Sequence, residues 1–156
     1  MNFKKIKNMI KIAKTEEEIV ECFHVLSALR PHLHADSFVA RIDRLKLETG
    51  YTLAYFLEND VKAVAGFRIS EWLHSGKYLE IEELITKEGE RSKGYGGKLF
   101  DWIVQHAQKT GCNQVRLVSG VSREEAHKFY IGKGMAFEAK YFSLNVEEQI
   151  ITKCSS

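Results

Sequence analysis

The chain has 156 residues, of which 44% are hydrophobic and 28% are charged, and these proportions are ordinary for one globular domain. Its formal net charge at pH 7 is only +2, so neither nucleic acid nor an anionic membrane is expected as a partner. No apolar run reaches the roughly 18 residues of a membrane-spanning helix, and lysines interrupt the N-terminal segment where a signal peptide would be apolar. We therefore expect a cytoplasmic protein with one domain over residues 1–156 and a core at about 10–145.

The lysine-rich N-terminal segment and the cysteines give two further expectations. Five lysines lie among the first fourteen residues, and we interpret them as a solvated arm, with a polyanion contact as the alternative. The cysteines Cys22, Cys112 and Cys154 are widely spaced and form no CxxC pair. Neither a disulfide framework nor a zinc site is indicated, and no metal is expected.

Two helices are predicted in the first third of the chain. Thr15 and Glu18 have the spacing of a capping box, and apolar residues then recur at helical intervals until Pro31. A second helix is predicted from about residue 36, and Gly50 ends it.

The rest of the chain predicts a mixture of strands and helices. β-favouring residues and turn residues such as Asn59-Asp60 separate the strands, and apolar residues at helical spacing mark the helices. The expected elements are strands at 51–57, 61–69 and 78–86, a helix at 95–110, a strand at 115–119, a helix at 122–131 and a strand at 136–144. The expected fold class is therefore α/β, with α+β character and a mixed sheet, in the order ααβββαβαβ.

A glycine-rich turn, Arg91-Ser92-Lys93-Gly94-Tyr95-Gly96, lies between a predicted strand and a predicted helix. Backbone N–H groups can converge on phosphate at such a turn. A Walker loop is excluded because Leu99 follows Gly97-Lys98, and a dinucleotide fingerprint is excluded because Leu99 replaces its third glycine. A glycine-rich turn without a ligand is the alternative.

The turn resembles the Arg/Gln-x-x-Gly-x-Gly/Ala motif of the GNAT superfamily of N-acetyltransferases, and its surroundings resemble that family too. The segment from Leu79 to Thr86 resembles the acidic fourth strand, and Ala126 to Met135 resembles the Ala-x-x-Phe-Tyr helix and the strand start after it. Met135 departs from the usual Phe, and Arg123 departs from the Asn of many members. The resemblance extends over about residues 15–144.

This resemblance implies an acyl-CoA N-acyltransferase fold, whose sheet splays between its fourth and fifth strands, and acetyl-CoA as the acetyl donor. The pantetheine arm would lie in the gap, and the pyrophosphate would lie on backbone N–H groups of the turn. The implied cofactor-binding residues are Leu84, Ile85, Thr86, Arg91, Ser92, Lys93, Gly94, Tyr95, Gly96, Gly97 and Lys98.

Amine acetylation also needs acid–base groups. An alkylamine is almost entirely protonated at pH 7, so a base has to accept its proton. Strict strand alternation places Glu80 and Glu82 on one face and Glu83 on the other. The resemblance favours Glu82, then Glu80, then Glu83 as the base, and it implies Tyr130 as the acid that protonates the CoA thiolate. The alternatives are a solvated strand face for the glutamates and a packing role for Tyr130.

The acceptor itself is left open. Arg30, His32 and His34, in the connection between the first two helices, can meet an acceptor carboxylate, whereas the acidic strand suits a polyamine or lysine. The expected function is acetyl transfer from acetyl-CoA to a primary amine of a small molecule, peptide or protein in a ternary complex. The alternative is a non-catalytic acyl-CoA-binding regulatory module. The oligomeric state is also open, a homodimer included.

Overall fold

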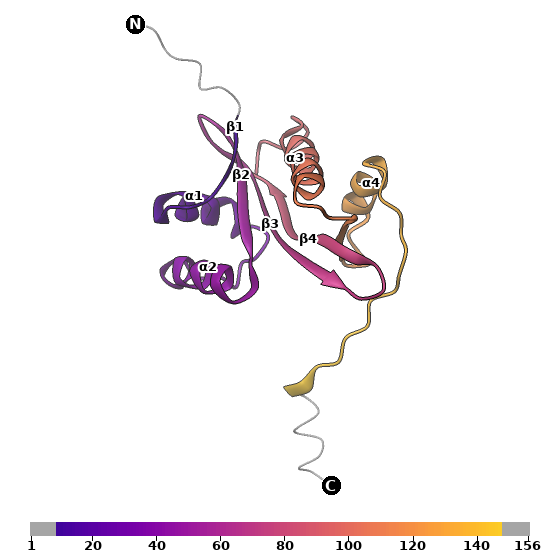
Figure 1. Cartoon of the computed structure of the whole chain (residues 1–156). Coiled ribbons are helices and arrows are strands. Elements are labelled where there is room, and N and C mark those ends of the chain that lie inside the picture. The colour runs from indigo at the N-terminus through magenta and orange to yellow at the C-terminus, as the bar shows by residue number, and fades with distance from the viewer. Residues whose placement is uncertain (1–8, 148–156) are drawn as a thin grey trace, which may run out of the picture. The chain divides into compact units, whose positions relative to one another are not determined.

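The structure is a computed structural model that describes residues 9–147 (Figure 1). The chain divides after Leu117 into two compact units, residues 1–117 and 118–156, and each is described by itself. Most of the N-terminal lysine arm and Cys154 lie outside the described residues. The single domain expected from the sequence stays a prediction.

Between residues 9 and 117, the first unit contains a sheet of five strands and three helices. The strands lie in the order β1-β2-β3-β4-β5, and all neighbours are antiparallel except β4 and β5, which are parallel. This arrangement confirms the predicted mixed α/β class. The elements are β1 (Met9–Ile12), α1 (Glu16–Leu26), α2 (Ala35–Thr49), β2 (Thr52–Glu58), β3 (Asp60–Trp72), β4 (Gly76–Thr86), α3 (Tyr95–Lys109) and β5 (Gln114–Leu117).

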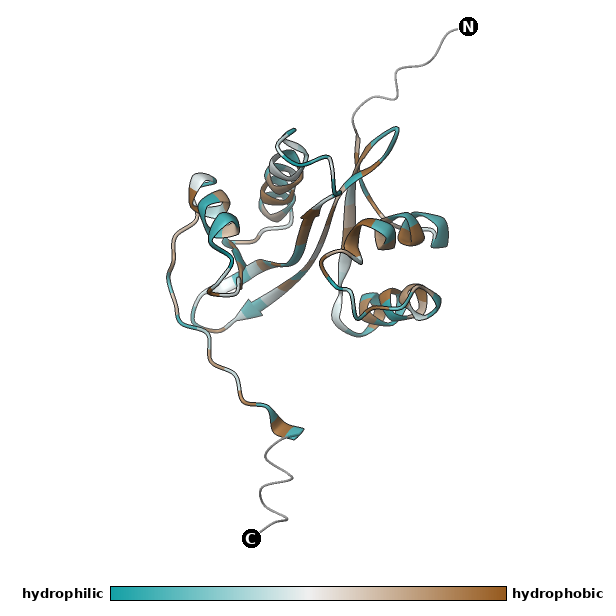
Figure 2. Ribbon diagram, turned by 180° about the vertical axis from the view of Figure 1, so that it is seen from behind, coloured by the Kyte–Doolittle hydropathy of each residue, from teal (hydrophilic) through white to brown (hydrophobic). Residues whose placement is uncertain are grey.

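Helices cover both faces of this sheet (Figure 1). On the α1–α2 face, side chains of α1 and α2 pack with Leu53, Tyr55 and Val64 in one buried cluster. On the α3 face, the Phe67 ring lies 5.5 Å from His106 of α3. Figure 2 shows that all three helices combine hydrophobic and hydrophilic residues, as expected for helices that lie on a sheet.

The sequence analysis missed strand β1. Ile10 and Ile12 alternate with Lys11 in it, and this short alternation is the signal that indicates a half-buried strand. The strand pairs with β2, with Met9 opposite Leu57 and Ile12 opposite Ala54. A run of only four residues within a lysine-rich segment gives a weak local signal, and its pairing with a distant strand is what stabilises it.

The second unit contains α4 (Glu124–Gly132). The strand predicted at 136–144 is wrong, because these residues have no ladder partner among the described strands. Phe137 and Phe142 are 84% and 85% exposed. Alternating apolar and polar side chains favour a strand only where a neighbouring backbone completes the hydrogen bonds. The observed order is therefore βααβββαβα.

Three further expectations concern membrane spans, metal sites and disulfides. Within residues 9–147, no helix combines the length and apolar character needed to cross a bilayer. In the same part of the chain, no three His, Cys, Asp or Glu side chains gather as a metal-binding group. Cys22 and Cys112 are free thiols, and burial raises the pKa of Cys22 to about 12.

The predicted capping box at the start of α1 is present and connects three elements. Glu18 accepts hydrogen bonds from the N–H groups of Thr15 and Lys14, and Thr15 Oγ1 accepts one from the Glu18 N–H. The same carboxylate accepts from Tyr55 Oη of β2 at 2.8 Å and from Lys11 Nζ of β1 at 3.3 Å. These bonds, the one from Lys14 above all, lower the pKa of Glu18 to about 2.

Glu18→Gln should lower the free energy of unfolding at pH 7 by about 1 kcal/mol, because it removes the charge from this cap. A lowered folded-state pKa stabilises the protein above the unfolded-state value of about 4.3, and the contribution disappears as the pH falls toward 2. Urea denaturation should therefore show that the difference in the free energy of unfolding between wild type and Glu18→Gln becomes smaller below about pH 4. Glu17→Gln, in the same exposed turn, is the control. Equal effects of both substitutions would contradict the assignment.

Candidate active site

The ladder between β3 and β4 changes register beside the acidic residues of β4. Gly66 pairs with Glu83 and Phe67 pairs with Ile81, which leaves Glu82 as the extra residue of a β-bulge. A bulge interrupts the alternation of side chains along a strand. The strict alternation assumed from the sequence is therefore wrong at Glu82.

Because of the bulge, the three carboxylates of β4 point to the same side of the sheet. Glu83 accepts a hydrogen bond at 2.5 Å from Tyr51, a member of the buried cluster on the α1–α2 face. Glu82 pairs with Arg68, whose guanidinium lies 5.7 Å from the centre of the Tyr51 ring. Glu80 stands opposite Arg68 in the ladder, so it shares that face. The prediction that placed Glu83 on the opposite face is corrected accordingly.

Each of these glutamates has an arginine partner from a different part of the fold. Arg68 of β3 places Nε 2.7 Å from Glu82 Oε1 and donates a hydrogen bond from Nη2 to Oε2 at 3.2 Å. Nη2 of Arg116, in β5, lies 3.5 Å from Glu80 Oε1. Arg30 lies 3.5 Å from Glu83 Oε1 and donates a hydrogen bond to the Glu82 carbonyl oxygen at 3.1 Å.

The connection between α1 and α2 therefore reaches the acidic strand through Arg30. Arg30 contacts both the backbone and a side chain of the bulge, whereas His32 and His34 of the same connection are exposed. The sequence analysis grouped these three residues as possible acceptor contacts. Of the three, Arg30 is the one that the structure brings to the glutamates.

The pKa of Glu82 is raised by its surroundings. Burial is the largest influence on it and raises its pKa above the ordinary value, and the charges of Glu83 and Glu80 act in the same direction. The Arg68 guanidinium opposes this rise but does not reverse it. The carboxylate is thus a stronger proton acceptor than an exposed glutamate.

The end of β4 beyond these glutamates has an open edge. β5 pairs with β4 only from Tyr78 to Ile81, whereas β3 pairs with β4 as far as Thr86. Among the described residues, the segment 82–86 therefore has a strand neighbour on one side alone. Its free edge carries backbone N–H and C=O groups that an extended ligand can bind. Leu84, Ile85 and Thr86 lie in this segment, where the sequence analysis expects the pantetheine arm.

The glycine-rich turn gives α3 an exposed N-terminus. Ser92 and Gly94 have left-handed backbone angles, with φ of 64° and 86°. The first hydrogen bond of the helix runs from the Lys98 N–H to the Gly94 carbonyl at 3.0 Å. The helix itself therefore supplies no acceptor for the N–H groups of Tyr95, Gly96 and Gly97. Such groups, together with the helix dipole, favour an anion.

The open edge and the helix start lie against each other. A Cβ atom added at Gly96 would lie 3.0 Å from Thr86 Oγ1, so the last residue of β4 contacts the first turn of α3. Side chains also hold the start of α3 in place. The buried Tyr95 ring lies 5.1 Å from the Phe56 ring, and its hydroxyl donates a hydrogen bond to Glu58. The Tyr95 side chain is therefore an anchor, and only its backbone is available to a ligand.

Charges around the turn are partly compensated. Glu90, just before the turn, pairs with Lys62 at 2.9 Å and with Lys93 at 2.6 Å. Arg91 and Lys98 are exposed. The turn thus presents positive side chains, while the Glu90 carboxylate is engaged by lysines.

Tyr130 belongs to the second unit, in α4. It is half-buried, and burial raises the pKa of its hydroxyl, with the Arg123 charge acting against the rise. A phenol with a raised pKa stays protonated at neutral pH and can donate a proton. Its role as an acid stays a prediction.

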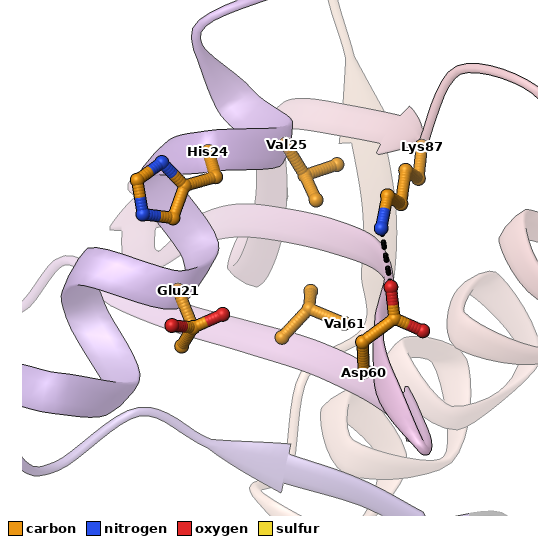
Figure 3. A pocket seen from close by; sticks show the side chains of 6 residues that line it. All are labelled: Glu21, His24, Val25, Asp60, Val61 and Lys87. Carbon is orange, nitrogen blue, oxygen red and sulfur yellow. Dashed lines mark hydrogen bonds and ion pairs between the residues drawn. The ribbon is translucent and has the colours of Figure 1, made fainter.

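A small cavity lies elsewhere in the first unit, between α1 and the start of β3 (Figure 3). It has a volume of about 60 Å³. Lys87 donates to Asp60 across part of its lining, as Figure 3 shows. Sites for small molecules usually measure some 300–1,000 Å³, so this cavity is too small for a cofactor. It contains none of the site residues predicted from the sequence.

Comparison with known proteins identifies the family. The model of the Acetyltransferase (GNAT) family matches residues 12–137. The chain belongs to the GNAT acetyltransferase family. It is 33% identical over 135 residues to YhdJ, an uncharacterized N-acetyltransferase of Bacillus subtilis strain 168, and the match covers 85% of this chain and 95% of YhdJ.

Two further matches are more distant. Aminoalkylphosphonate N-acetyltransferase of Salmonella typhimurium strain LT2 is 27% identical over 100 residues, which cover 64% of this chain and 63% of that protein. The aminoglycoside N-acetyltransferase AAC(6')-Iy, solved in complex with CoA, matches with a TM-score of 0.75 at 12% identity, covering 88% of this chain and 95% of that one. The second match shows a shared fold.

Sequence analysis missed the residues that surround the glutamates of this acetyltransferase. Tyr51, Arg68 and Arg116 belong to no motif and come from three different segments. The local signal of the two arginines is a charge within a largely apolar strand, as in Phe67-Arg68-Ile69. Such a charge on a covered face needs a partner, but the sequence does not say which one.

Gly94→Ala should weaken acetyl-CoA binding, because alanine strains the left-handed backbone and shifts the N–H groups at the start of α3. Gly89→Ala is a matched control, since Gly89 also has a positive φ and neither position has an atom within 4 Å of an added Cβ. Both variants should lose about 1 kcal/mol of stability, measured by denaturation. Calorimetry should show loss of CoA affinity for Gly94→Ala alone; equal affinities would contradict a pyrophosphate site at this turn.

Proposed function

We propose that this GNAT protein transfers the acetyl group of acetyl-CoA to a primary amine, by direct attack of the amine on the thioester in a ternary complex. The observation that carries the proposal is the continuous arrangement of β4. Glu82 lies at its bulge, the open edge follows, and Thr86 contacts the first turn of α3 at Gly96. A base, a backbone edge and an anion site thus follow one another along a single strand and turn.

The cofactor would lie along this path. The open edge supports binding of the pantetheine amides at Leu84, Ile85 and Thr86, and the α3 N-terminus supports binding of the pyrophosphate. The exposed side chains of Arg91, Lys93 and Lys98 would add positive charge near the phosphates. The proposed chemistry needs no metal ion.

The reaction can be balanced with two side chains. The acceptor ammonium gives one proton to the Glu82 carboxylate, and the free amine forms a C–N bond with the thioester carbonyl carbon. The C–S bond then breaks, and the departing thiolate takes a proton from the Tyr130 hydroxyl. The second proton of the nitrogen returns to the phenolate through solvent, and Glu82 releases its own proton to solvent, so each turnover releases one proton in total.

Among the three glutamates, Glu82 suits the role of base best. Glu83 is the least exposed, at 15% against 28% for the other two, and it already accepts a hydrogen bond from Tyr51. Glu80 is the second candidate, because its contact with Arg116 is long. The acceptor is proposed to be a small molecule, a choice supported by the relative named for aminoalkylphosphonates.

Purified protein given acetyl-CoA and a panel of amines should release free CoA thiol. Glu82→Gln should lower turnover at neutral pH roughly 100-fold, the usual order for loss of a general base, and leave CoA affinity unchanged by calorimetry. Tight CoA binding without turnover on any amine or peptide would favour the non-catalytic module instead.

The pH–rate profile tests Glu82 more directly. Because its pKa is raised, the acid limb of kcat/KM should lie above the ordinary glutamate value of about 4.3, since the base works only when deprotonated. Arg68→Met removes the charge that lowers this pKa, so the limb should move to higher pH. An acid limb that stays in place in Arg68→Met, or that persists in Glu82→Gln, would remove Glu82 from the mechanism.

Tyr130→Phe should lower kcat at least tenfold, because the thiolate loses its proton donor, while the KM for acetyl-CoA changes little. Phe129→Leu, a neighbouring aromatic position in α4, controls for packing, since the two rings lie 5.3 Å apart. Turnover of Tyr130→Phe equal to that of wild type would leave Tyr130 with a packing role only.

A further inference from the structure

The glutamates of β4 and the arginines that face them have no net charge together. Arg68 of β3, Glu80 of β4 and Arg116 of β5 stand opposite one another in the sheet register, so they form one row across the α1–α2 face. Together with the Arg68–Glu82 and Arg30–Glu83 pairs, three carboxylates face three guanidinium groups. A polycation would therefore meet no net negative charge here.

Arg116 is held rigidly and uses few of its donors. The centre of its guanidinium lies 3.5 Å from the centre of the Trp72 ring and 3.8 Å from that of the Tyr78 ring. Its contact with Glu80 is 3.5 Å long, and its buried Nε has no hydrogen-bond partner among the described residues. The two rings meet edge to face with their centres 5.3 Å apart, so the guanidinium lies in the corner that they form. Contacts with both rings keep its planar fork oriented, and that fork matches a carboxylate or phosphonate.

We propose that the acceptor of this enzyme carries an anionic group in addition to its amine, and that Arg116 binds this group. The inference rests on the proposed function, because it places the amine at Glu82. Glu80, the register partner of Arg116, precedes Glu82 by two residues, so the amine and the anion would lie roughly 7 Å apart along β4. A short alkyl chain between the two groups spans this separation, as in an ω-amino acid.

The row can accept an anion while a second arginine stays near Glu80, although the ion pair of that arginine, Arg68, is with Glu82. Glu80 stands between Arg68 and Arg116 in the register, so it keeps a cation beside it when the acceptor takes Arg116. A second ammonium group at the same place would face Arg116 and be repelled. An enzyme that binds an anionic group at Arg116 thus disfavours diamines. Of the two acceptors that the sequence leaves open, this selects the amino-acid-like one over the polyamine.

The first test compares acceptors of equal length on the wild-type protein. CoA release gives kcat/KM for 5-aminopentanoate, pentylamine and 1,5-diaminopentane. One charge-assisted contact predicts that 5-aminopentanoate exceeds pentylamine roughly tenfold or more, and that the diamine is the poorest of the three. Equal values, or a preference for the diamine, would overturn this inference and leave the acetyltransferase proposal standing. An absence of CoA release with every amine would instead overturn the proposed function.

The second test assigns the effect to Arg116. In Arg116→Gln the ratio of KM between pentylamine and 5-aminopentanoate should fall to about one, and Arg116→Lys should retain part of it, because lysine keeps the charge. Arg44→Gln, in an exposed ion pair on α2, should keep the wild-type ratio. A merely structural role would change both KM values alike. An unchanged ratio in Arg116→Gln would overturn the proposal, and if that variant fails to fold, Arg116→Lys decides.

Discussion

Glu82 has no partner on β3, because the residues on either side of it pair directly with Gly66 and Phe67. The absence of a side chain at Gly66 makes this register possible. A Cβ there would lie 1.8 Å from Tyr51 Oη and 2.4 Å from Glu83 Oε2, so any other residue would displace the hydrogen bond between them. One glycine on β3 thus permits the bulge on β4, and the bulge places three carboxylates together.

The same bulge leaves core side chains on one face of the sheet and the carboxylates on the other. Phe67 and Ile81 remain buried, and Phe67 packs against α3, while the carboxylates turn to the other face. Carboxylates on a half-buried face lose hydration, and the arginines from β3, β5 and the α1–α2 connection offset that loss. The incomplete compensation at Glu82 explains its raised pKa. A carboxylate that is half-buried yet paired thus keeps a raised pKa and accepts a proton more readily than an exposed one.

β4 also carries both the proposed acceptor site and the proposed site of the acetyl donor. Its first part pairs with β5 and carries Glu80, and its last part has an open edge and contacts the turn at Gly96. Because the backbone is continuous, the distance from base to anion site is set by strand geometry and varies little with side-chain motion. The anchoring of Tyr95 on Phe56 holds the helix start in the same frame. The proposed acetyl donor and the acceptor would thus be positioned by one rigid element.

The sequence by itself determined the features that neighbouring residues encode: the capping box of Thr15 and Glu18, the end of α2 at Gly50, and the glycine-rich turn before α3. Their signals lie within four or five positions, so they can be read from the chain alone. The resemblance to GNAT proteins likewise rested on contiguous motifs. Only the tertiary structure decided the bulge at Glu82, the arginine partners of the glutamates, the pairing of β1 and the absence of a strand at 136–144. Pairing between strands joins residues that are distant in the chain, and its register depends on packing across the whole sheet, which no local pattern records.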